Sequence, residues 1–251
     1  LVDGPASINI LSGEVEVLCA TLKTGIKMVI REGKRIPLEV KEKAEFDLTL
    51  GEKAAVNEVE GSTIPVSWEK AANEVLVLEK PVTVMVVGGV DSGKTSFCAY
   101  LANRALRDRR SVALIDADLG QSDVGPPSTI GSCRLAKPII DPFEIGAESI
   151  CFIGVTSPSG AVSKVIEGIA GMKEKALKRG VGVLIINTDG WIEGEDAVRY
   201  KVALAKQIKP NLLIGILEQS ELTFLLGALT ETQNLVVESS PAVRKRDREE
   251  R

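Results

Sequence analysis

Residues 88–95 combine glycine, lysine and threonine at a spacing that suits phosphate binding. They read Gly88-Gly89-Val90-Asp91-Ser92-Gly93-Lys94-Thr95 and satisfy the pattern G-x-x-x-x-G-K-T. Gly88 and Gly93 permit backbone angles that turn successive amides into a concave anion site. In such a loop the lysine reaches the β- and γ-phosphates and the threonine hydroxyl ligates Mg²⁺. We therefore predict that these eight residues and Ser96 bind a nucleotide, with Lys94 catalytic and Thr95 a metal ligand.

A pair of carboxylates follows the next apolar run along the chain. Residues 111–115 lead into Asp116-Ala117-Asp118-Leu119-Gly120-Gln121. Nucleotide sites of this kind place an acid at the end of a neighbouring strand, where it holds Mg²⁺ directly or through water. Either aspartate suits that position, and the other is expected to cap the turn. Asp118 stands nearer the glycine and is our choice as the catalytic and metal-linked carboxylate.

The composition narrows the chemistry further. The 251 residues include no histidine, so any general base must be a carboxylate, a lysine or water. Asp118 is then the natural group to accept or orient a proton from an acceptor hydroxyl.

The four cysteines form no C-x-x-C pair, which argues against a zinc site or disulfide framework and favours a reducing cytosol. A net charge of −4 neither favours nor excludes a nucleic-acid substrate.

Two kinds of periodicity divide the chain. Residues 81–240 alternate apolar runs with helical stretches, which predicts an α/β P-loop NTPase fold with a doubly wound, mostly parallel sheet. The expected strands are 82–87, 111–115, 149–155, 181–187, 212–217 and 235–237, and the expected helices are 94–107, 161–178, 195–207 and 221–226. Residues 1–80 are expected to form a small all-β domain of short strands, including one over 14–22, followed by a helix over 68–77 that Ser67 caps.

The last segment, 241–251, is rich in arginine. Its cations alternate with carboxylates, which is typical of a solvent-exposed helix end with salt bridges. The alternative is an arginine-bearing lid that closes over the transferring phosphate.

No apolar run reaches about 18 residues, so no membrane span is expected. The sequence begins at Leu1 rather than methionine, and we expect it to be part of a longer product.

Several motifs occur in an order that is more selective than the glycine loop alone. After the loop, which carries Asp91, come D-x-D-x-G-Q at 116–121, T-S-P at 156–158, N-T-D-G-W at 187–191 and the arginines of 241–251. This succession resembles the polynucleotide 5′-hydroxyl-kinase family, which includes the RNA-kinase subunit of the pre-mRNA 3′-end cleavage factor, rRNA-processing kinases and archaeal homologues. Its members continue past the lid into a further β domain, whereas this sequence ends at Arg251.

The resemblance implies roles for matching positions. Gln121 would lie near the acceptor end, and Thr156 and Trp191 would clasp the terminal nucleotide of the substrate. A Trp ring suits base stacking, although a Trp at this position could equally fill space beside the sheet. Arg246 and Arg251 would be the catalytic lid arginines, with Arg244 and Arg248 as alternatives in another register. In the family the N-terminal β module contributes to adenine binding.

The implied activity is ATP-dependent, Mg²⁺-linked transfer of the γ-phosphoryl group to a 5′-hydroxyl end of RNA, with DNA as a second substrate. ATP is favoured over GTP because 187–191 lack the lysine of N-K-x-D. Two alternatives stay open: a non-catalytic ATP-binding scaffold of an RNA-processing complex, and a P-loop ATPase or GTPase switch. The expected partners are RNA ends and RNA-processing proteins, in the cytoplasm or, in a eukaryote, the nucleus.

Overall fold

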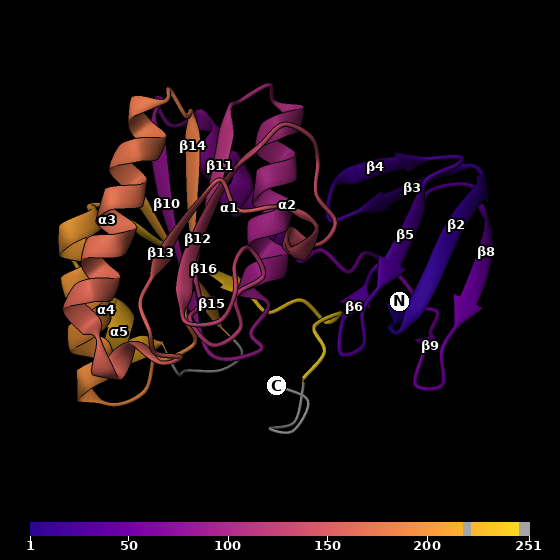
Figure 1. The fold of residues 1–251 in the computed structure, drawn as a ribbon. Helices are drawn as coiled ribbons and strands as arrows, with labels where there is room; N and C mark the ends of the chain where they lie inside the picture. The colour runs from indigo at the N-terminus through magenta and orange to yellow at the C-terminus, as the bar shows by residue number, and fades with distance from the viewer. Residues whose placement is uncertain (218–221, 246–251) are drawn as a thin grey trace. The chain divides into compact units, whose positions relative to one another are not determined.

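The structure is a computed structural model that describes residues 1–217 and 222–245. The chain divides into two compact units (Figure 1). One comprises Leu1–Pro65 with the segment that begins at Ser240, and the other comprises Val66–Ser239. This boundary lies earlier than residue 80, because the first helix packs within the second unit.

The second unit is built on a seven-stranded sheet in the order β13-β12-β11-β14-β10-β15-β16. Its strands are β10 (Val82–Gly88), β11 (Val112–Ala117), β12 (Thr129–Leu135), β13 (Ser149–Phe152), β14 (Val183–Thr188), β15 (Leu212–Leu217) and β16 (Asn234–Glu238). Neighbours from β11 to β16 pair in parallel, while β12 is antiparallel to both β11 and β13. The predicted P-loop fold with a mostly parallel sheet is confirmed.

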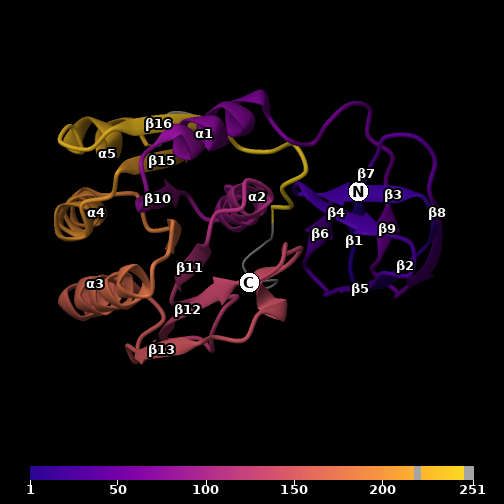
Figure 2. The ribbon, with the colours of Figure 1, turned by 90° about the horizontal axis from the view of Figure 1, so that it is seen from above.

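Helices cover both faces of this sheet (Figure 2). They are α1 (Val66–Val77), α2 (Lys94–Arg107), α3 (Val162–Lys178), α4 (Glu195–Ile208) and α5 (Thr223–Ala228), with α3, α4 and α5 on one face and α1 and α2 on the other. Burial on both faces explains the continuous apolar runs, since every residue of β10, β11 and β14 is buried. The parallel strands therefore end at one common edge, where β10 and β11 lead into the two motifs.

One strand of the sheet was not predicted. Strand β12 has the sequence TIGSCRL. Its glycine and polar residues interrupt both patterns that predict a strand, a continuous apolar run and a regular alternation of apolar and polar residues. It forms because β11 on one side and β13 on the other supply hydrogen-bond partners along its length. These partners are the strands that precede and follow β12 in the chain, and they lie beyond the range of a local residue pattern.

The first unit is all-β, as predicted. Its three small sheets have the orders β6-β1-β9, β5-β2-β8 and β4-β3-β7. The strands are β1 (Val2–Asp3), β2 (Ala6–Ser12), β3 (Glu14–Val17), β4 (Ala20–Lys23), β5 (Lys27–Ile30), β6 (Arg35–Ile36), β7 (Glu39–Val40), β8 (Glu45–Leu50) and β9 (Ala55–Val56). The single strand expected over 14–22 is wrong: Leu18 and Cys19 adopt positive φ and form a two-residue hairpin turn without glycine or asparagine.

Helix α1 belongs to the second unit because of one aromatic residue. Trp68 is fully buried, packs edge-on against Phe97 of α2 at 5.2 Å and donates its indole N–H to the carbonyl oxygen of Glu238 at 2.7 Å. The expectation that Ser67 caps this helix is wrong, since the helix begins at Val66 and the Ser67 hydroxyl bonds to the Glu238 carboxylate. In the ranges 1–217 and 222–245, no helix is long and apolar enough to cross a membrane.

Candidate active site

The predicted phosphate loop connects β10 to α2. Asp91 and Gly93 adopt φ values of 54° and 95°, so two left-handed positions turn the chain within three residues. Gly93 is the N-cap of α2, and no side chain caps this helix. The first backbone amides of a helix without a side-chain cap are free for an anion, and the helix dipole favours negative charge at the same point. The loop therefore has the backbone geometry of a phosphate site.

Two buried polar side chains point to the same use of the loop. Lys94 donates to the carbonyl oxygen of Gly89 at 2.5 Å, and burial lowers its pKa while Asp118 opposes that shift. The hydroxyl of Ser92 is buried and has no hydrogen-bond partner within the described chain. A Cβ at Gly88 would lie 2.6 Å from that hydroxyl, so only glycine leaves room for it. A phosphate would satisfy both the ammonium and the loop donors.

The two aspartates of the second motif differ in their surroundings. Asp116 is buried, and its two oxygens accept five hydrogen bonds, from Ser122 Oγ, Asn187 Nδ2 and the amides of residues 118, 123 and 124. Burial raises the pKa of Asp116 to about 6. Its carboxylate is fully engaged in shaping the loop, so Asp116 is the structural member of the pair.

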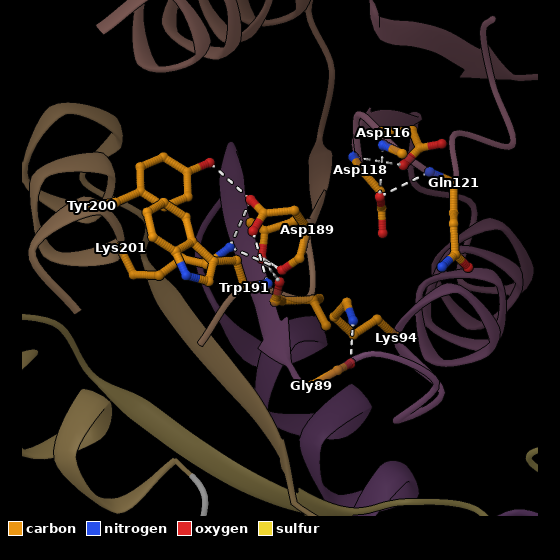
Figure 3. A network of polar contacts seen from close by, with 12 residues as sticks. Gly89, Lys94, Asp116, Asp118, Gln121, Asp189, Trp191, Tyr200 and Lys201 are labelled. Carbon is orange, nitrogen blue, oxygen red and sulfur yellow. Dashed lines mark hydrogen bonds and ion pairs between the residues drawn. The ribbon is translucent and has the colours of Figure 1, made fainter. Parts of the chain in front are cut away.

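Asp118 keeps one oxygen available. Its Oδ1 accepts from the amides of Gly120 and Gln121, whereas Oδ2 has no hydrogen-bond partner in the ranges that the structure covers. Figure 3 shows its carboxylate pointing toward Lys94. Burial raises the pKa of Asp118, and the Lys94 ammonium opposes that rise. A carboxylate with a free oxygen beside a phosphate loop suits either a metal or a hydroxyl proton, which favours the choice of Asp118.

Asn187 links the two motifs from the strand between them. On β14 it is paired with Val86 on one side and Asp116 on the other. Its Nδ2 lies 3.1 Å from Asp116 Oδ1 and 3.4 Å from Thr95 Oγ1, and its buried Oδ1 has no partner among the described residues. Side-chain oxygen atoms therefore lie close to the Thr95 hydroxyl, and oxygen is the ligand atom that Mg²⁺ prefers.

The described ranges contain no group of three or more acidic or cysteine side chains able to hold a metal ion. Mg²⁺ is usually bound through one or two protein oxygens together with phosphate oxygens and water rather than by an all-protein cage. Thr95 and Asp118 are the residues that would hold it.

The N-T-D-G-W motif packs directly against the phosphate loop. A Cβ at Gly190 would lie 2.7 Å from Cγ2 and 2.9 Å from the backbone nitrogen of Val90. Only glycine therefore allows this contact, which supports the loop from the side of β14. This role of Gly190 is not evident from the sequence, because the contact joins residues one hundred positions apart.

Trp191 is held by a buried polar group. Asp189 accepts from the Trp191 amide at 3.0 Å, from the Tyr200 hydroxyl at 2.9 Å and from the Lys201 ammonium at 2.9 Å. The Trp191 ring stacks on Tyr200 with 5.9 Å between centroids and an interplanar angle of 21°. In the view of Figure 3, Trp191 and Tyr200 lie on one side of Asp189, with Lys94, Asp118 and Gln121 on the other. Tyr200 thus covers one ring face, and Trp191 is a half-buried side chain that packs against the hydrophobic core, so a base could stack on the other ring face alone.

Lys201 is the functional candidate that sequence reasoning missed. Its side chain is 0% exposed, and burial lowers its pKa while Asp189 opposes the shift. After burial, the Lys201 charge also contributes to the lowered pKa of Lys94, so the two ammonium groups repel each other. A lysine on the apolar face of α4 was the only sequence signal, and it does not identify the partner.

Thr156 and Gln121 come together at the end of the second motif. Thr156 is exposed, and its carbonyl oxygen would lie 3.2 Å from a Cβ at Gly120. Gln121 follows directly and is half-buried. The T-S-P segment and the D-x-D-x-G-Q loop are therefore neighbours.

The arginines of the expected lid are only partly described. Arg246, Arg248 and Arg251 lie outside the described residues. Arg244 is half-buried in the first unit, where its charge adds to the lowering of the Asp3 pKa by Arg35 and of the Glu32 pKa by Lys53. Arg35, on the same unit, forms a two-pronged ion pair with Asp3 at 2.7 and 2.9 Å.

Comparisons with known proteins identify the relatives of this chain. A family model described as the P-loop of mRNA cleavage and polyadenylation factor CLP1 matches residues 88–251, more than half of the chain. A polyribonucleotide 5′-hydroxyl-kinase of Pyrococcus abyssi is 34% identical over 156 residues, 62% of this chain and 44% of the relative. Its counterpart in Pyrococcus furiosus is 30% identical over 188 residues, 75% and 52% respectively.

More distant similarity covers more of the chain. A CLP1 homologue of Nematostella vectensis is 28% identical over 237 residues, 88% of this chain and 55% of that protein. The Clp1p structure solved in complex with Pcf11p matches all of this chain and 69% of that chain, with a TM-score of 0.74 and 13% identity, and so shows the same fold. The chain spans about half the length of the curated relatives that it matches.

Proposed function

The chain belongs to the CLP1 P-loop family, and from this membership we propose that the whole protein is an ATP-dependent polynucleotide 5′-hydroxyl kinase. The substrate is a 5′-hydroxyl end of RNA, with DNA as a second acceptor. Several relatives carry the name polyribonucleotide 5′-hydroxyl-kinase. The observation that carries the proposal is the free carboxylate oxygen of Asp118 beside the buried ammonium of Lys94.

The proposed reaction transfers one phosphoryl group. The 5′-hydroxyl oxygen attacks the γ-phosphorus of ATP, the bond to the β–γ bridging oxygen breaks, and ADP leaves. The hydroxyl proton passes to Asp118, whose raised pKa makes it a better proton acceptor than an ordinary aspartate. Lys94 and the loop amides bind the phosphate oxygens, where positive charge stabilises the transition state.

Mg²⁺, held by Thr95 and, through water, by Asp118, would neutralise charge on the phosphate oxygens and leave the free oxygen of Asp118 available for the hydroxyl proton. Gln121 and Thr156 would contact the acceptor end, and the free face of Trp191 would stack on its terminal base. Arg246 and Arg251 are proposed for the lid. RNA-processing protein partners and a cytoplasmic or, in a eukaryote, nuclear place of action belong to the same proposal.

Label transfer tests this proposal directly. The full-length protein is incubated with γ-labelled ATP, Mg²⁺ and 5′-hydroxyl oligonucleotides of RNA or DNA. We expect label at the 5′ end, and we expect Lys94→Ala to lower kcat by about 10²- to 10³-fold, the usual effect of removing one transition-state contact. Lys206→Ala is the control, because this exposed lysine lies on α4 and has no role in the site.

Binding measurements separate the alternatives. A protein that binds ATP tightly without label transfer to any RNA or DNA end would be a scaffold subunit instead. Nucleotide-dependent dimerisation without transfer would indicate a P-loop switch. A Lys94→Ala variant with near-normal turnover would remove the assignment of the phosphate site.

A further inference from the structure

An exposed aromatic ring lies at the outer edge of the large sheet. Strand β13 is the last strand on its side, and its burial alternates along its length. Cys151 faces α3, since a Cβ at Gly168 of that helix would lie 3.2 Å from its sulfur. Phe152, the last residue of the strand, is 68% exposed. An apolar ring of this size in solvent gains stability when a ligand covers it.

The direction of β13 brings Phe152 to the edge of the sheet that carries the candidate active site. Strand β12 is antiparallel to both β11 and β13, so β13 runs in the same direction as β11. The carboxyl end of β13, where Phe152 stands, therefore lies at the same edge as Asp118.

Hydrogen bonds connect this end of β13 to the D-x-D-x-G-Q loop. The amides of Ile153 and Gly154 both donate to the carbonyl oxygen of Ser128, at 2.9 and 3.1 Å, and the Ser128 amide donates to Leu119 at 2.8 Å. Leu119 is part of the D-x-D-x-G-Q motif. Phe152 thus lies beside the D-x-D-x-G-Q loop and the T-S-P segment, at the same edge of the sheet.

The ring is held beside a turn and a cation. Gly154 has φ of 92°, and a Cβ there would lie 3.5 Å from the Phe152 ring, so the ring leans over the turn that leads to Thr156. The Lys164 ammonium lies 5.6 Å from the ring centroid and donates to the Ile153 carbonyl at 2.8 Å. A flat apolar face beside a fixed positive charge matches a base and its phosphate.

We propose that Phe152 and Lys164 bind the nucleotide that follows the 5′-terminal one in a single-stranded polynucleotide. The base stacks on the ring face opposite Lys164, and the ammonium contacts the adjoining phosphate. This inference rests on the proposed function and adds a second nucleotide subsite to it. Stacking accepts any base, so the subsite confers a requirement for chain length rather than for sequence.

The experiment compares substrates of two lengths with the full-length protein. A nucleoside 3′-monophosphate offers only the terminal position, whereas a ten-nucleotide 5′-hydroxyl RNA also fills the second. We expect Phe152→Ala to raise KM for the RNA by roughly 5- to 100-fold, the usual range for one lost stacking contact. Its kinetics with the mononucleotide should stay as in the wild type. Phe152→Trp keeps a ring and should keep the wild-type KM for RNA.

Val77→Ala is the matched control, because Val77 is 78% exposed at the end of α1, just before β10 begins at the opposite edge of the sheet. Fluorescence anisotropy of the labelled RNA, in the presence of a non-hydrolysable ATP analogue, gives a second measurement that needs no catalysis. Lys164→Ala should weaken RNA binding and reduce its salt dependence.

An unchanged RNA KM and an unchanged RNA dissociation constant in Phe152→Ala would overturn the subsite and leave β13 as an edge for a protein segment. If the wild type binds RNA and loses this binding in Phe152→Ala, but transfers no phosphate, the kinase proposal fails and the subsite stands. If Phe152→Ala loses activity equally toward the mononucleotide and the RNA, Phe152 acts on the terminal position, and the inference is wrong.

Discussion

Replacing Lys201 by methionine tests whether the buried ion pair organises the active site. The Lys201 and Asp189 side chains are 0% and 6% exposed, and their charged atoms lie 2.9 Å apart. At an effective dielectric constant near 20 their attraction is about 6 kcal/mol, which offsets the desolvation of both groups. Methionine fills a similar volume but leaves the Asp189 carboxylate buried without its cation.

The expected cost follows from that uncompensated charge. Removing one partner of a buried pair costs about 3–5 kcal/mol, whereas replacing both partners by neutral groups costs much less. We therefore expect Lys201→Met to lower the free energy of unfolding by about 3–5 kcal/mol. Adding Asp189→Asn should recover about half of that loss. For a unit of this size, each kcal/mol shifts Tm by about 2–4 °C.

Urea unfolding of the single variants and the double variant completes the cycle. Lys206→Met is the control, because this lysine is exposed on the same helix and its replacement should change stability by no more than about 0.5 kcal/mol. The Trp191 amide donates to Asp189, so Lys201→Met should also raise KM for a polynucleotide. A loss below about 1 kcal/mol in Lys201→Met, or strict additivity of the two substitutions, would refute the reasoning.

Three further predictions follow from the site and its supports. Gly190→Ala should weaken ATP binding at least tenfold by calorimetry, because the new Cβ meets the Val90 backbone, while Gly171→Ala in an open part of α3 leaves binding unchanged. The rate should fall as the pH is lowered through the Asp118 pKa, because protonation removes the base, and burial places this pKa above the ordinary aspartate value. The residual activity of Asp118→Asn should lack this acid limb of the pH profile. Trp68→Ala should cost about 3–5 kcal/mol in chemical unfolding, because it leaves a large cavity between α1 and α2.

Local patterns in the sequence were sufficient to predict the glycine-rich loop and the helix that follows it. Helix α2 was predicted over 94–107 and spans those residues, because the glycine turn before it and its apolar periodicity are both local signals. The order of motifs was sufficient for the family. The preference for Asp118 over Asp116 came from its position beside Gly120, and the hydrogen bonds around the two carboxylates favour the same choice.

Other features depended on contacts between distant segments. Strand β12 is stabilised by its two neighbours, and the turn at Leu18 and Cys19 has no glycine to indicate it. The partner of Lys201 lies on another element, and the charge of this lysine alone does not identify Asp189. Sequence periodicity reports which face of an element is buried, but it does not report what the buried face meets. The choice of candidate site residues therefore came from local sequence, while their support and orientation were decided by tertiary packing.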